Sequence, residues 1–72
     1  MEYAIQIASA PDREQVVAEV WYGEDMIAEI NQEGPELAIL LFPIETMLDL
    51  NLLLEAIQRA AQRLRGEITP SS

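Results

Sequence analysis

The longest regular hydrophobic pattern in the chain runs from Leu50 to Arg65 and predicts an amphipathic helix. Its apolar residues recur every three or four positions, which places them on one side of a helix. They are Leu50, Leu53, Leu54, Ile57, Ala60, Ala61 and Leu64. A helix of about 16 residues is marginal in isolation, because protein helices gain most of their stability by packing an apolar face. We therefore expect the first half of the chain to form the surface on which this helix packs.

Four segments before the helix have the composition or the alternation of β-strands. They are residues 2–8, 15–22, 26–33 and 37–42. The first alternates with a period of two, and the second is rich in β-branched and aromatic residues. The fourth is apolar at every position, which is typical of a strand that is covered on both faces or lies at an interface.

The order strand, strand, strand, strand, helix predicts an α+β fold, a four-stranded antiparallel β-meander with the C-terminal amphipathic helix packed on one sheet face. We expect residues 1–66 to form one domain, with Gly66 as the helix C-cap and residues 67–72 as a frayed tail. Three residues are candidates for the helix N-cap, and the sequence does not choose among them. They are Thr46, Asp49 and Asn51.

The register of the second and third strands follows from their apolar residues. A three-residue loop with Tyr22 opposite Met26 collects most apolar residues on the helix-facing side, whereas a shift by one residue scatters them. That side then holds Val16, Ala18, Val20, Tyr22, Met26, Ala28 and Ile30. A three-residue hairpin usually has Gly at its last position, but here Gly23 comes first, so the register at this turn stays open.

The same register predicts a contact surface on the opposite face of the sheet. Its residues are Val17, Glu19, Trp21, Ile27 and Glu29. Two glutamates opposed on adjacent strands repel each other, and a tryptophan beside them is a frequent binding anchor, so we expect an apolar centre with an acidic rim. Three alternatives remain. In the first, Trp21 packs under the loop before the second strand or against a second copy. In the second, the glutamates are only the polar residues of a solvated sheet face, and in the third, the register is slipped and Trp21 is in the core.

The charge balance narrows the choice of partners. Thirteen Asp and Glu residues stand against four Arg, with no Lys and no His, for a net charge of −9. This charge repels phosphate backbones, so we expect no direct nucleic-acid binding, and it attracts basic protein surfaces. The alternative is that the charge only keeps a small, apolar-rich chain in solution.

The residue types that most catalytic sites need are missing. Without Cys or His, thiol nucleophiles, imidazole bases and ordinary zinc sites are excluded, and three isolated glycines form no phosphate-binding loop. A cation held only by Glu19 and Glu29 would lack the further ligands that calcium and magnesium sites recruit. We expect no enzymatic activity, no catalytic residues, no cofactor and no metal.

Size and hydropathy suggest where and in what state the chain acts. A domain of 72 residues buries only about 60% of its unfolded surface, so a partner copy would help to stabilise it, and a homodimer is expected. No stretch reaches the roughly 18 apolar residues of a membrane span, and the start of the chain lacks the basic residues of a signal peptide. We expect a cytoplasmic protein without a membrane partner.

Two functional hypotheses follow. The first is a small acidic protein-binding protein, an inhibitor of the immunity, antitoxin or anti-defence type, that occludes a basic partner protein, including partners that act on nucleic acid. The second is a homodimeric structural or adaptor module whose second sheet face is its own dimer interface. The first rests on size and charge alone, and neither identifies the partner.

Overall fold

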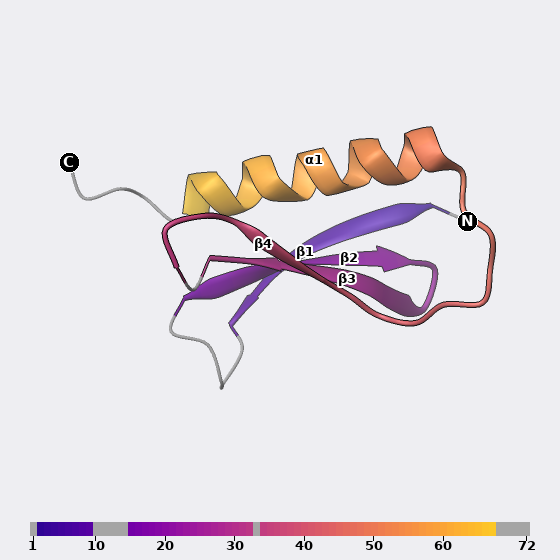
Figure 1. Cartoon of the computed structure of the whole chain (residues 1–72), viewed down its shortest axis with the longest axis horizontal. Helices are drawn as coiled ribbons and strands as arrows, with labels where there is room; N and C mark the ends of the chain where they lie inside the picture. The colour runs from indigo at the N-terminus through magenta and orange to yellow at the C-terminus, as the bar shows by residue number, and fades with distance from the viewer. Residues whose placement is uncertain (1, 10–14, 33, 68–72) are drawn as a thin grey trace.

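The computed structural model describes residues 2–9, 15–32 and 34–67 of the chain. The elements are β1 (Tyr3–Ser9), β2 (Val16–Tyr22), β3 (Asp25–Asn31), β4 (Ala38–Leu41) and α1 (Leu50–Glu67). The four strands form one antiparallel sheet in the order β1-β2-β3-β4, and α1 lies along one face of it (Figure 1). The α+β fold predicted from the sequence is confirmed.

The hydrophobic core lies between the helix and the middle of the sheet. Its buried residues are Ala18, Val20, Ile27, Ala28, Ile30, Ala56, Ala60 and Leu64. Two of the three buried helix residues, Ala56 and Ala60, are alanines, and the third, Leu64, is the largest fully buried side chain. No helix among the described residues is both long enough and apolar enough to cross a bilayer.

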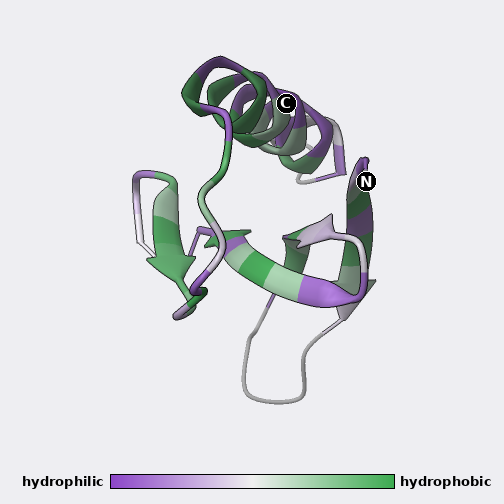
Figure 2. Ribbon diagram, turned by 90° about the vertical axis from the view of Figure 1, so that its right-hand side faces the viewer, coloured by the Kyte–Doolittle hydropathy of each residue, from purple (hydrophilic) through white to green (hydrophobic). Residues whose placement is uncertain are grey.

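The buried stripe of α1 is rotated from the one that its periodicity predicts. Ala56 is buried although it was not in the predicted stripe, whereas Leu50 is 66% exposed and Leu54 is 47% exposed. The cause is the position of the helix, which packs on β1, β2 and β3 and does not contact β4. Figure 2 shows the helix above one side of the sheet, with apolar stretches outside the part that it covers.

The pairing of β2 with β3 agrees with the predicted register at three positions and differs from it next to the turn. Three pairs are as predicted: Ala18 with Ile30, Glu19 with Glu29, and Val20 with Ala28. Next to the turn, however, Trp21 pairs with Met26 and Tyr22 with Asp25. The predicted pairs of Tyr22 with Met26 and of Trp21 with Ile27 are therefore wrong.

The reason is a shorter turn followed by a β-bulge. The loop contains two residues, Gly23 and Glu24, and Gly23 has a φ of 65°. A glycine with positive φ at the first loop position is the pattern of a type II′ hairpin turn. The register shift leaves Ile27 as the extra residue on β3, so that Ile27 and Ala28 both face the helix and Met26 moves to the opposite face.

The structure identifies the N-cap of α1 among the three candidates and extends the C-terminal end of the helix. The side chain of Asp49 accepts a hydrogen bond from the backbone N–H of Leu52 at 3.0 Å, so Asp49 is the N-cap. At the other end the helix continues through Gly66 to Glu67, so the prediction of Gly66 as a C-cap beyond the helix is wrong. Residues 68–72, most of the predicted tail, lie outside the described residues.

Candidate partner-binding surface

A row of side chains crosses all four strands on the sheet face opposite α1. It consists of Gln6, Glu19, Glu29 and Leu40, each paired with the next across neighbouring strands. Their neighbours along β2 and β3 lie in the helix-side core, and side chains alternate between faces along a strand. The two central carboxylates are thus directly opposed on the face that the helix does not cover.

Each carboxylate is oriented by the side chain two residues further along its own strand. The indole N–H of Trp21 donates to Oε1 of Glu19 at 3.1 Å, and the side-chain amide of Asn31 donates to Oε2 of Glu29 at 3.0 Å. Residues two apart on a strand share a face, which makes both contacts local consequences of the β conformation. Hydrogen bonds to charged acceptors are stronger than neutral ones, so these donors restrict the rotamers of both glutamates.

The surface is partly buried. Glu19, Glu29 and Trp21 are half-buried, and Asn31 is 7% exposed. Partial removal of two opposed carboxylates from water strengthens their repulsion relative to a fully solvated pair. Among the described residues, no group of three or more side chains could hold a metal ion.

Three of the five predicted contact residues lie together, and two do not contribute an accessible side chain. Glu19, Trp21 and Glu29 form the hydrogen-bonded arrangement described above. Val17 lies on the same face but is only 1% exposed, and Ile27 is 4% exposed because the bulge turns it into the core. The third alternative is half right: the register at Trp21 is shifted by one residue, but Trp21 is not part of the helix-side core.

Sequence reasoning missed three residues of this face. Met26 reaches it through the bulge, Asn31 orients Glu29, and Leu40 is 44% exposed beside Glu29. The sequence did indicate that Leu40 could reach this face, since Leu40 belongs to the strand that was predicted to be apolar on both faces. The alternative that Trp21 packs beneath the loop before β2 involves residues 10–14, which lie outside the described residues.

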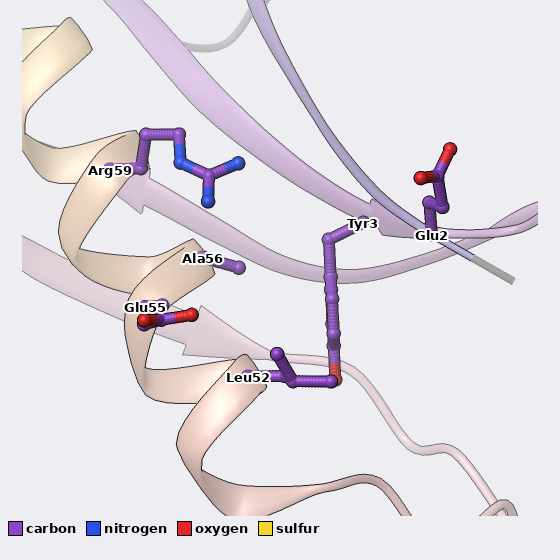
Figure 3. Close-up of a pocket in the computed structure, with 6 residues that line it drawn as sticks. All are labelled: Glu2, Tyr3, Leu52, Glu55, Ala56 and Arg59. Atoms are coloured by element: carbon purple, nitrogen blue, oxygen red, sulfur yellow. The ribbon is translucent and has the colours of Figure 1, made fainter.

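A concave region lies on the helix side of the sheet, between the start of β1 and α1 (Figure 3). Its open hollow has a volume of about 290 Å³ and is lined by Glu2, Tyr3, Leu52, Glu55, Ala56 and Arg59. The ring of Tyr3 extends towards Leu52 (Figure 3). It also packs against the ring of Tyr22, with ring centroids 4.9 Å apart.

The hydroxyl of Tyr3 is the unusual atom of this hollow. It is buried without a hydrogen-bond partner among the described residues. Burial raises the pKa of Tyr3 above 10.0, and Tyr22 and Asp49 add to the increase. A phenol with a raised pKa stays neutral at physiological pH, so we assign it no acid–base role.

Comparison of the chain with protein-family models, with curated proteins and with solved structures found no match. The functional argument therefore depends on the geometry of the chain itself.

Proposed function

We propose that this chain is a small acidic protein-binding protein that inhibits a basic partner protein by occlusion, as immunity proteins, antitoxins and anti-defence inhibitors do. The observation that supports this proposal is the opposed pair of Glu19 and Glu29, oriented by Trp21 and Asn31 on the face away from the helix. A cytoplasmic location and the absence of catalysis, cofactor and metal belong to the same proposal.

The mechanism is electrostatic docking followed by exclusion. An arginine or lysine of the partner donates charge-assisted hydrogen bonds to the two carboxylates. The carboxylates then occupy positions that a nucleic-acid-acting partner would use for phosphates. Because Trp21 and Asn31 hold the carboxylates in place before binding, less side-chain entropy is lost when the partner docks. The net charge of −9 increases the association rate.

The test is affinity capture with the intact chain and two charge-matched double variants. Glu19→Gln with Glu29→Gln removes the opposed pair, whereas Glu55→Gln with Glu67→Gln removes two exposed helix carboxylates and the same net charge. We expect the first variant to lose a basic protein that the wild type and the second variant both retain. Equal capture by the two double variants would contradict the proposal, because net charge alone would then explain binding.

Association kinetics with the captured protein sharpen the test. The association rate should fall steeply with added salt, and Trp21→Phe should increase the dissociation rate, because it keeps the ring but removes the donor to Glu19. A salt-independent association rate would argue against electrostatic docking.

The second candidate function, a homodimeric structural or adaptor module, is favoured by a different observation. The predicted version used the sheet face opposite the helix as the dimer interface. Glu19 and Glu29 occupy the centre of that face, and the most exposed apolar strand is instead β4 at the edge of the sheet.

A further inference from the structure

The outer edge of β4 has unpaired backbone groups that can accept another strand. The backbone N–H of Phe42 donates to the carbonyl of Ile27 at 3.0 Å, which makes this a hydrogen-bonded pair. In an antiparallel ladder such pairs alternate with non-bonded pairs, so Leu40 bonds towards β3 while Ile39 and Leu41 direct their N–H and C=O groups outward. No described strand lies on that side of β4.

Apolar side chains line the same edge on the helix side. Ile39 and Leu41 pair with core residues of β3 and so face the helix layer, yet they are 44% and 65% exposed. On α1, Leu50 and Leu54 are also exposed, and the helix does not contact β4. We call Ile39, Leu41, Leu50 and Leu54 the β4 flank. A groove of about 210 Å³ lies between the start of β4 and α1, and Ile39 of this flank lines it together with Ile57 and Ala61.

The β4 flank lacks the charged side chains that usually protect an edge strand, although β4 has only four residues and is followed by Pro43. Edge strands are commonly guarded by charged side chains, especially lysine, which discourage pairing with another chain. This chain has thirteen carboxylates, but the segment between Glu36 and Glu45 contains no charged residue. An uncharged apolar edge of this kind marks an interface.

The charges at the two ends of the β4 flank are opposite in a way that suits a second copy. Arg65 lines the groove at the end where Ala38 begins the strand. At the other end, Glu24, Asp25 and Glu45 line one shallow hollow beside the start of β3, together with Trp21 and Met26 of the face away from the helix. A two-fold axis beside Leu40 exchanges the ends, so the end of each copy that carries Arg65 lies next to the acidic end of the other. Glu36 also borders the Arg65 end, which reduces this attraction without removing it.

We propose that the β4 flank is the interface of a symmetric dimer in which β4 pairs antiparallel with β4 of a second copy. With the axis at Leu40, Ile39 pairs with Leu41 of the partner subunit, and the two pairs related by symmetry exchange about four hydrogen bonds. The result is a continuous eight-stranded sheet with both helices on one face, in which Ile39 and Leu41 of one copy pack beside Leu41 and Ile39 of the other. Such an interface is isologous and closed, so it ends at a dimer.

The test is sedimentation equilibrium of the full chain over roughly 1 μM to 1 mM, a range that spans weak and moderate dimers. We expect the wild type to dimerise and Leu41→Lys to raise the dissociation constant about tenfold or more, because it places a charge in the apolar edge. Met47→Lys is the matched control, since Met47 is 97% exposed and lies outside the β4 flank, and it should leave the constant unchanged.

Three further variants extend this test. Ile39→Lys places a charge at the position that pairs with Leu41 of the other copy, and it replaces Leu41→Lys should that variant lose its circular dichroism spectrum. Arg65→Glu should weaken the dimer, whereas Arg59→Glu, on the opposite side of the helix, should not. A monomeric wild type at all concentrations, or equal dimerisation of Leu41→Lys, Ile39→Lys and Met47→Lys, would overturn the proposal. Loss of Glu19 and Glu29 should leave the dimer intact, which separates this result from that for the proposed function.

Discussion

The two outer edges of the sheet differ in how they are covered: the β1 edge is covered by α1, whereas the β4 edge is not. At β1, the side chain of Arg63 donates to the outward-facing carbonyl of Ile5 at 2.8 Å, and α1 packs over the strand. At β4, neither the helix nor any described strand covers the edge, and its side chains are apolar. One edge therefore resembles the boundary of a finished domain, whereas the other resembles an internal strand that lacks its neighbour.

The difference originates in where the helix is placed. α1 packs over β1, β2 and β3, so its polar and basic residues can reach β1. Two of its exposed leucines, Leu50 and Leu54, lie on the side towards β4, whereas the third, Leu52, lines the hollow beside Tyr3. A small domain with a marginal core would gain stability by covering those leucines. Substitutions at the β1 edge, at the β4 edge and in the core test this difference.

The largest contrast is expected between a buried and an exposed leucine. Leu64 is 0% exposed in the core, so Leu64→Ala should lower the free energy of unfolding by about 2–5 kcal/mol. Leu41 is 65% exposed, so Leu41→Ala should change the stability of the monomer by less than about 0.5 kcal/mol. Urea unfolding at several protein concentrations separates monomer stability from dimer stability. A large loss from Leu41→Ala at low concentration would show that the β4 side is covered within one chain.

A smaller effect is expected from Arg63 at the protected edge. Arg63→Ala removes the hydrogen bond to the Ile5 carbonyl and should cost about 1 kcal/mol, measured by urea unfolding. Arg59→Ala is the control, because it removes the same charge from the same helix without a hydrogen bond to β1 among the described residues. Equal effects of the two substitutions would mean that Arg63 acts through charge and not through closing the edge.

The smallest effect, with the opposite sign, is expected from Tyr3. Its buried hydroxyl has no hydrogen-bond partner among the described residues, so Tyr3→Phe should leave stability unchanged or raise it by up to about 1 kcal/mol near pH 7. Chemical unfolding of both proteins measures this difference. A loss of more than about 1 kcal/mol would indicate that the hydroxyl has a partner.

The pH dependence gives a second readout for the same residue. The folded chain holds the proton of Tyr3 more tightly than the unfolded chain, because burial raises its pKa above 10.0. The resulting stabilisation is complete below pH 10 and is lost as the pH rises through the folded-state pKa. Stability of the wild type should therefore fall faster above pH 10 than that of Tyr3→Phe. Parallel pH profiles would contradict this assignment.

Local pattern predicted the elements well. The number and order of the strands, the start of the helix at Leu50 and the pairing of Glu19 with Glu29 all follow from hydrophobic periodicity and turn residues. They were predictable because a strand with one apolar face, and a helix with one apolar stripe, have few ways to bury it.

The errors have tertiary causes. Ile27 and Met26 exchange faces because a two-residue turn at Gly23 is compensated by a bulge, and a bulge leaves almost no trace in the alternation. Leu50 and Leu54 were predicted to be buried because periodicity defines a stripe but not which part of it meets the sheet. Only the position of α1 over β1–β3 turns Ala56 inward and leaves the leucines outside.

Amide hydrogen exchange at β4, measured by NMR at several protein concentrations, tests most directly whether this edge receives a second strand. Leu40 bonds towards β3, so its amide should be protected at every concentration, whereas the amides of Ile39 and Leu41 should become protected only as the concentration rises. Fast exchange of Ile39 and Leu41 at all concentrations would contradict the account and leave β4 as a free edge.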